Sequence, residues 1–426
     1  MISPELAHTL IAAIIAISIA LMLIRPRGIA EAYWIGGGVA LLLGLRLITP
    51  RLALRGVAES LDVILFLIGM MLISELASEQ GVFDWLSGIA VHNADGSCLR
   101  LFALVYLVGT AVTVFLSNDA TAVVLTPAIL AAVRKAKVQP LPYLFACAFI
   151  ANAASFLLPI SNPANLVVFH DAMPPLGRWL LAFGVPCVFS IVVTFCILCW
   201  VFRKELARKI DHTVEASSLT SNGKLVLAGV VVMIAVLLAA SSFGLNLGLP
   251  TCLAAVAVVA LVCVKERANP LALSRGISWE MLALVAGLFI MVDAMESIGA
   301  MRHTEAWLAW AQHLGLVAGQ FVTGFAVGLA NNLVNNLPLG LIAGSTVHVA
   351  RANGPIADAV LIGVDLGPNL SVTGSLATIL WLIALRKENI EVSFWDFFKV
   401  GVVAMPLAML ASLGGAILMH VFFSVS

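Results

Sequence analysis

Long apolar runs separated by short polar segments follow one another along the whole chain. Ten runs are long enough to cross the roughly 30 Å hydrocarbon core of a bilayer as helices. They lie at about 6–24, 31–48, 61–79, 141–170, 177–201, 224–242, 247–264, 279–298, 356–385 and 395–423. The pattern therefore predicts an all-α integral membrane protein with ten transmembrane helices.

Two further apolar segments, at about 101–135 and 312–350, carry a polar cluster near their middle. The first cluster is Ser117-Asn118-Asp119, and the second is Asn335-Asn336 followed by Pro338. Non-helical backbone at membrane depth survives only where it is buried in protein or lines a cavity. We therefore expect two re-entrant hairpins, each made of two half-membrane helices that meet at a polar tip.

Two of the predicted spans are themselves broken by Pro, Gly and polar residues. The fourth contains "LLPISNPANLVVF" and the ninth contains "VDLGPNLSVTGSLATILWL". Pro and Gly release backbone groups from the helical hydrogen-bond ladder. These segments are expected to unwind within the membrane.

The breaks occur in pairs, which indicates an internal duplication. Residues 61–81 align without gaps on 279–299, so that Asp62 meets Glu280 and Glu75 meets Asp293. The two hairpin tips align at nearly the same offset, as do residues 152–165 with 365–378. The predicted units are a first repeat at 1–202, a cytoplasmic linker at 203–223 and a second repeat at 224–426.

Each repeat holds five spans, so the second enters the membrane with the opposite orientation. Inverted repeats with paired broken helices are typical of secondary transporters, whose substrate binds near the membrane midplane. Only six basic residues fall on one side of the predicted topology: Arg46, Arg51, Arg55, Arg178, Arg302 and Arg351. The other 17 basic residues mark the cytoplasmic side. Both termini are then expected to be external.

Composition excludes a soluble protein, because 62% of the residues are apolar and only 11% are charged. No nucleic-acid partner, no cofactor, no metal site and no catalytic residue is predicted, and an enzyme is not expected. The seven cysteines lie mostly in apolar runs and are interpreted as buried hydrophobic residues. The pair Cys196 and Cys199 leaves arsenic or metal binding open.

Polar residues at the predicted midplane are the candidate site, since polar groups in hydrocarbon are expensive and mark function. The predicted substrate-binding set is Asn118, Asp119, Thr121, Asn152, Ser161, Asn162, Asn165, Asn335, Asn336, Thr373, Gly374, Ser375 and Thr378, and the predicted proton carriers are Asp119 and Asp365. Lys, Arg and His are absent from this set, so it suits a small neutral polyhydroxy solute better than a dianion. Some of these side chains are expected only to cap the half-helices.

Three motifs, "FLSNDATAVVLTP", "NNLVNNLP" and "DLGPNLSVTGSLATILWL", resemble those of the ArsB-type arsenite efflux permeases of the ion transporter superfamily. The resemblance extends over essentially the whole chain. It implies export of arsenite and antimonite across the bacterial inner membrane, by a mobile transport domain moving on a scaffold. Members of such families can form homodimers or associate with a soluble ATPase subunit, so the resemblance leaves both partners open for this chain.

Related sodium–carboxylate symporters carry Ser-Asn-Thr at both tips, a pattern that this chain does not share. We expect proton antiport, because a carboxyl group removed from water holds its proton more readily. The elevator-type motion is what the resemblance implies. The alternative is a sodium-coupled carboxylate transporter or a sodium/proton antiporter on the same scaffold.

Overall fold

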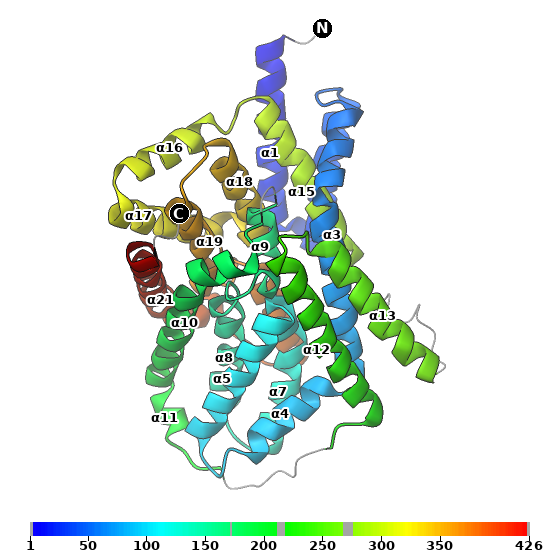
Figure 1. Ribbon diagram of the computed structural model, residues 1–426, viewed down its shortest axis with the longest axis vertical. Coiled ribbons are helices and arrows are strands. Elements are labelled where there is room, and N and C mark those ends of the chain that lie inside the picture. Colours follow the sequence, from blue (N-terminus) through cyan, green and yellow to red (C-terminus); the bar gives the residue numbers. More distant parts are fainter. Residues whose placement is uncertain (1–2, 171–172, 211–217, 267–275, 424–426) are drawn as a thin grey trace.

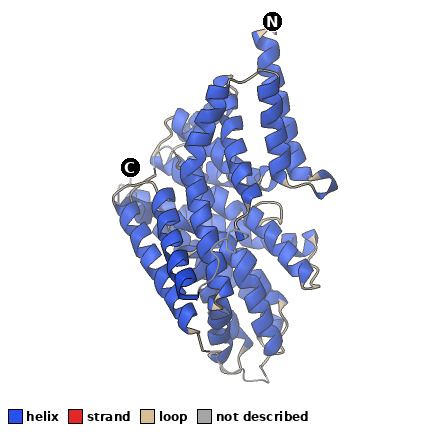
Figure 2. Cartoon of the chain, turned by 90° about the vertical axis from the view of Figure 1, so that its right-hand side faces the viewer, coloured by secondary structure: helices blue, strands red, loops and turns tan. Residues whose placement is uncertain are grey.

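The computed structural model describes residues 3–170, 173–210, 218–266 and 276–423, and within these ranges it contains helices and no strand (Figures 1 and 2). Eight of the described helices are long and apolar enough to cross a membrane. A ninth candidate is the bent pair α15 and α16, whose axes meet at 83°. The predicted all-α membrane fold is therefore confirmed.

One group of helices, called here the scaffold group, contains the N-terminal helices of both halves. Its members are α1 (Pro4–Ile24), η1 (Pro26–Gly28), α2 (Glu31–Gly44), α3 (Pro50–Glu79), α12 (Ser221–Ser242), α13 (Gly248–Glu266) and α15 (Trp279–Ser297). Helix α3 packs along α13 and α15, and α1 and α2 pack against α15.

Helices α3 and α15 form an antiparallel pair at the centre of the scaffold group. Thr49 starts α3 by accepting a hydrogen bond from the amide of Leu52 at 3.2 Å, and Pro50 follows at the first helical position. Gly56 lets the backbones touch, since a Cβ there would lie 2.9 Å from the Cα of Ile290. At the other end of α3, Glu75 lies against Gly276, just before α15.

The rest of the first half begins with a short helix and the first hairpin. These elements are α4 (Val82–His92), α5 (Cys98–Phe115), α6 (Asn118–Ala120), the π turn η2 (Thr121–Leu125) and α7 (Thr126–Lys135). They lead into α8 (Leu141–Ala153), η3 (Pro159–Ser161), α9 (Pro163–Val168), α10 (Leu176–Val201) and α11 (Arg203–Leu206).

The second half repeats this order of elements. It contains α16 (Arg302–His313), α17 (Leu316–Val334), α18 (Asn336–Val349), α19 (Gly354–Leu366), η5 (Gly367–Asn369), α20 (Leu376–Lys387) and α21 (Phe394–Phe423). We call α5–α10 and α17–α21 the hairpin group. In Figure 1 the first hairpin lies toward the lower end of the molecule and the second toward the upper end.

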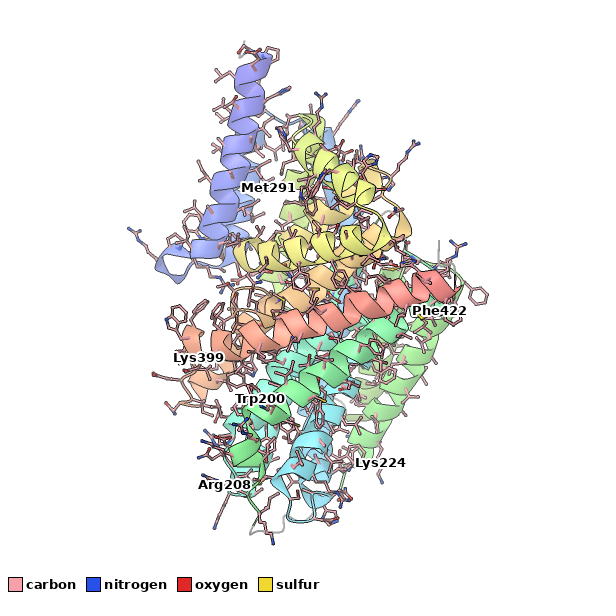
Figure 3. All side chains as sticks on the ribbon, turned by 90° about the vertical axis from the view of Figure 1, so that its left-hand side faces the viewer. Trp200, Arg208, Lys224, Met291, Lys399 and Phe422 are labelled. Atoms are coloured by element: carbon pink, nitrogen blue, oxygen red, sulfur yellow. The ribbon has the colours of Figure 1, made fainter. Side chains whose placement is uncertain are left out.

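The long C-terminal helices of the two halves, α10 and α21, hold the hairpin group together. They run side by side in Figure 3, where Trp200 marks α10 and Lys399 and Phe422 mark α21. The Ser412 hydroxyl of α21 donates a hydrogen bond to the carbonyl of Pro186 in α10 at 2.9 Å. The two halves share this order of elements, while the duplication and the inverted orientation of the halves in a bilayer stay predictions.

The structure differs from the predicted elements in three places. Helices α4 and α16 were not predicted, because they are short and amphipathic and carry charged residues. The first arm of each hairpin, α5 and α17, contains 18 and 19 residues. Each arm is therefore about 27 Å long or more, which exceeds the half-membrane length that was predicted. The predicted span 141–170 is two short helices, α8 and α9, separated by the expected break.

Candidate functional site

The first hairpin tip is an unwound turn. Its polar side chains accept hydrogen bonds from backbone amides that have no partner within a helix. The Ser117 hydroxyl accepts a hydrogen bond from the amide of Ala120 at 3.1 Å, and Asn118 Oδ1 accepts one from the amide of Asp119 at 2.9 Å. Thr121 Oγ1 lies 2.8 Å from Thr113 Oγ1, inside the hairpin. Ser117 and Asp119 are the polar residues of this tip that line a cavity.

The second tip is built in a similar way. Asn335 has a φ of 76° and a ψ of 153°, a backbone conformation that favours glycine, and its Oδ1 caps α18 at the amide of Leu337. Asn336 is buried at the start of α18. Both tips therefore begin their second arm with a polar cap, as expected for a helix that starts inside the membrane.

The two broken segments bind each other through buried side chains. Asn162 Nδ2 donates to Asp365 Oδ1 at 2.8 Å, and Asn152 Nδ2 donates to Asn369 Oδ1 at 3.0 Å. All four residues are at most 1% exposed. These bonds fix the break between α8 and α9 against the break between α19 and α20.

Other polar residues of the breaks satisfy released backbone groups. Asn165 Nδ2 donates to the carbonyl of Ser155 at 2.9 Å, and the hydroxyl of Ser161 donates to the carbonyl of Val114 at 2.9 Å. Ser375 caps α20 at the amide of Thr378, and the two hydroxyls of these residues lie 2.9 Å apart. Such bonds are required where unwound backbone is buried away from water.

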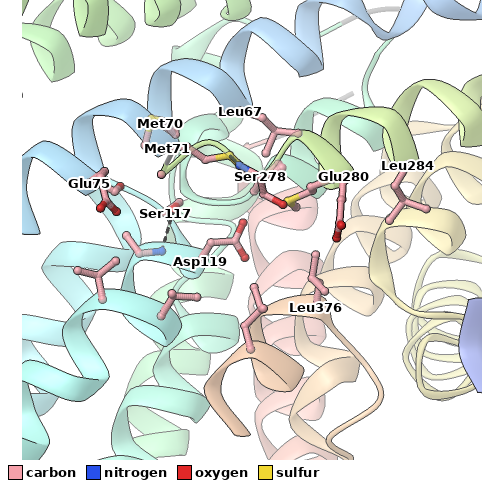
Figure 4. A pocket seen from close by; sticks show the side chains of 18 of the residues that line it. Leu67, Met70, Met71, Glu75, Ser117, Asp119, Ser278, Glu280, Leu284 and Leu376 are labelled. Carbon is pink, nitrogen blue, oxygen red and sulfur yellow. Dashed lines mark hydrogen bonds between the residues drawn. The ribbon is translucent and has the colours of Figure 1, made fainter. Parts of the chain in front are cut away.

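A cavity of about 320 Å³ separates the first tip from the scaffold group (Figure 4). Ser117 and Asp119 line it from the hairpin, and Pro163 and Leu376 line it from the starts of α9 and α20. The opposite wall contains Glu31, Glu75, Ser278, Glu280 and the thioethers of Met70, Met71 and Met281. Four carboxylates thus line this cavity, and no Lys, Arg or His does so among the described residues.

A second cavity of about 40 Å³ lies at the second tip. Asn335 and Thr373 line it, and Glu31 and Leu376 line both cavities. Arg25 also lines it and forms an ion pair with Glu31. The Thr373 hydroxyl donates a hydrogen bond to the carbonyl of Asn332 at 3.0 Å. This bond joins the segment before α20 to α17 of the second hairpin.

The structure divides the predicted site residues into two classes. Asp119, Asn335 and Thr373 line the cavities. The buried residues that line neither cavity are Asn118, Thr121, Asn152, Ser161, Asn162, Asn165, Asn336, Asp365, Gly374, Ser375 and Thr378. Their assignment to substrate or proton binding stays a prediction.

Sequence reasoning missed Glu31, Glu75, Ser278 and Glu280 as cavity residues. Glu75 lies near the end of a predicted span, where a charged residue ordinarily faces water. The useful signal was the repeat, which pairs Glu75 with Asp293 and Asp62 with Glu280. None of the seven cysteines lines the large cavity, and no metal-binding group of three or more His, Cys, Asp or Glu side chains occurs in the part of the chain that the structure describes.

Comparison with known proteins places these features in a family. A family described as citrate transporter matches residues 7–364. An arsenical pump membrane protein of Yersinia enterocolitica is 29% identical over 353 residues, which cover 79% of this chain and 81% of the relative. One from Escherichia coli (strain K12) is 30% identical over 351 residues, with the same coverage.

The fold also has a solved counterpart. The Alcanivorax borkumensis YdaH transporter superposes with a TM-score of 0.59 and covers 89% of each chain. The two sequences are only 14% identical, so this likeness supports the fold alone.

Proposed function

Because this chain belongs to the citrate transporter family and is related to ArsB-type arsenical pump membrane proteins, we propose that it exports arsenite and antimonite from the cytoplasm. The relatives are transporters, which agrees with a protein that is not an enzyme.

The acidic lining of the large cavity is the observation that supports this substrate. Glu75, Asp119 and Glu280 would repel an anion such as citrate, because charge repulsion is strong in a confined, weakly polar space, whereas the charge of Glu31 is balanced by Arg25. Arsenous acid is neutral near pH 7 and carries three hydroxyl groups. Ionised carboxylates accept hydrogen bonds only, so they complement a solute that donates them.

Proton antiport supplies the driving force in this proposal. Asp119 lines the cavity and exchanges a proton there as arsenite binds or leaves. Asp365 is fully buried and is bound by Asn162, so a change in its protonation would act on the contact between the two breaks. One positive charge moving inward down about 100 mV supplies about 2.3 kcal/mol, or nearly a fifty-fold concentration ratio.

An elevator-type motion is the conformational part of the proposal. Both tips and both breaks belong to the hairpin group, while the opposite cavity wall belongs to the scaffold group. A rigid displacement of the hairpin group along α3 and α15 would carry the cavity contents past a fixed wall. The direct hydrogen bonds between the two breaks favour movement as one body.

The proposed setting is the bacterial inner membrane, with both termini external and the basic segment around Arg203 and Lys224 in the cytoplasm. A reporter enzyme that is active only outside the cytoplasm, fused to the C-terminus, should be active. A homodimer and a soluble ATPase docked on the basic segment stay proposals.

Purified protein in sodium-free liposomes tests the substrate. Arsenite flux should proceed without sodium and should not be inhibited by excess citrate or succinate, because the cavity repels carboxylates. Sodium-dependent citrate or succinate flux without arsenite flux would instead favour the sodium–carboxylate alternative.

A further inference from the structure

Sulfur lines the large cavity as thioether and not as thiol. Met70 and Met71 of α3 and Met281 of α15 line it, whereas none of the seven cysteines, all of which the structure describes, does so. The whole chain contains 13 methionines in 426 residues, so three among the 20 residues that line one cavity are a local concentration. The proposed mechanism uses carboxylates and hydroxyl groups, and it gives these sulfur atoms no role.

The three methionines belong to the scaffold wall that faces the first hairpin tip. Figure 4 shows Met70 and Met71 on the α3 side of the cavity, across from Asp119. Met70 and Met281 are only 3% and 6% exposed, so they are part of a packed wall, while Met71 is partly exposed. The sulfur of Met71 accepts a hydrogen bond from the amide of Ser278 at 3.4 Å, which holds this side chain against the start of α15.

A thioether is a neutral, polarisable donor that has no proton to lose. A thiol would displace a hydroxyl group of arsenous acid as water and form a covalent arsenic–sulfur bond, which would retain the solute. A thioether cannot make this exchange, so its contact with the metalloid stays non-covalent and reversible. Soft sulfur donors prefer soft acceptors. Antimony is larger and more polarisable than arsenic, so a thioether contact favours antimonite over arsenite.

The carboxylates and the thioethers of the cavity suit different parts of such a solute. Glu75 and Asp119 accept hydrogen bonds from its hydroxyl groups. Arsenite and antimonite both carry three hydroxyl groups, so these bonds hold the two solutes alike. Discrimination between them requires a group that contacts the central atom, and a thioether lone pair is suited to that contact.

We propose that the thioethers of Met70, Met71 and Met281 determine specificity by favouring antimonite over arsenite in the large cavity. This inference rests on the proposed export of these two solutes. The three methionines lie on α3 and α15, which the proposed elevator-type motion leaves in place. They therefore contact the solute only while the first tip faces this wall. Their effect belongs to solute binding, so it changes KM and leaves kcat nearly unchanged.

Leucine replaces methionine at nearly constant volume and removes only the sulfur, an exchange that packed interiors tolerate well. In inside-out vesicles, the triple variant Met70→Leu, Met71→Leu, Met281→Leu should lose about tenfold of its preference for antimonite, equivalent to about 1.4 kcal/mol, through a higher KM for antimonite. Met71→Leu alone, at the partly exposed position, should shift the preference in the same direction and keeps the test available if the triple variant does not fold. Met233→Leu, buried in α12 away from the cavity, should keep the wild-type preference.

Equilibrium dialysis of antimonite and arsenite against the purified protein in detergent separates this inference from the proposed function. If the wild type binds antimonite more tightly than the triple variant does, but vesicles accumulate neither solute, the thioether site stands and the proposed export fails. If the wild type transports both solutes and the leucine variants keep its ratio of KM values, the inference is overturned and the export stands. Absence of both binding and transport would overturn both.

Discussion

At the scale of single residues, short polar side chains replace the backbone hydrogen bonds that each break removes. Ser117, Asn162, Asn335 and Ser375 all cap the helix that follows a break. Asn162 has a second role, because its amide also binds Asp365. The Asn162 side chain therefore both caps α9 and connects the two halves of the chain.

Replacing Asn162 by Ala should destabilise the protein by about 2 to 4 kcal/mol. The change removes the cap at the amide of Ala164, 3.0 Å away, and leaves the buried Asp365 carboxyl without its amide partner. Thermal unfolding of the purified protein in detergent measures the effect.

The exposed Asn93, at the end of α4, provides the matched control. Asn93→Ala should unfold close to the wild-type temperature. Equal shifts for the two variants would mean that the Asn162–Asp365 contact does not hold the breaks together.

The polar tips and breaks could be predicted from the sequence because polar residues inside apolar runs are conspicuous. Asp119, Asn335 and Thr373 do line cavities. The same pattern could not assign the carboxylates of Glu75 and Glu280 to the cavity. Each lies near a span end, where a charged residue ordinarily faces water, and only the packing of α3 on α15 turns them toward the first tip.

At the scale of elements, glycines set how closely α17 of the second hairpin approaches α19 and η5 of the second broken segment. Gly324 and Gly328 of α17 face Gly363 and Gly367 of α19 and η5. A Cβ at position 363 would lie 2.8 Å from the carbonyl oxygen of Gly324 and 2.9 Å from Cβ of Val327. Small residues are the usual means of close helix contact in lipid, where no hydrophobic effect drives the helices together.

Gly363→Ala should therefore destabilise the hairpin group by about 1 to 3 kcal/mol through overpacking. Gly184→Ala is the matched control, since that position lies within α10 and has open space around it. Alanine there should be neutral or slightly stabilising, because it favours the helix by up to about 1 kcal/mol.

Thermal unfolding of the two glycine variants in one detergent provides the comparison. A lower unfolding temperature for Gly363→Ala alone fits the close packing of α17 on α19. Unchanged unfolding of Gly363→Ala would contradict it.

Hydrophobic periodicity predicted the long elements and missed the short ones. Helices α4 and α16 contain 11 and 12 residues, too few to cross a membrane, and charged residues such as Asp84 and Glu305 made them look like loops. Their helical form depends on neighbours, since α4 packs on α5 and α7, and α16 packs on α17 and α18.

At the scale of the whole molecule, α3 and α15 form a wall with a cavity toward each end, one of about 320 Å³ lined by Glu75 and Glu280 and one of about 90 Å³ lined by Arg55 and Asp293. Asp119 of the first tip lines the cavity at the Glu75 end. The predicted duplication aligns Glu75 of α3 on Asp293 of α15.

Arsenite accumulation in inside-out membrane vesicles, with a proton gradient imposed and then collapsed by an uncoupler, is the most direct measurement. We predict accumulation that the uncoupler abolishes and that Asp119→Asn loses, while a wild-type gradient of about 100 mV sustains up to roughly fifty-fold enrichment. Full proton-driven accumulation in both Asp119→Asn and Asp365→Asn, or accumulation insensitive to the uncoupler, would contradict proton-coupled export through this cavity.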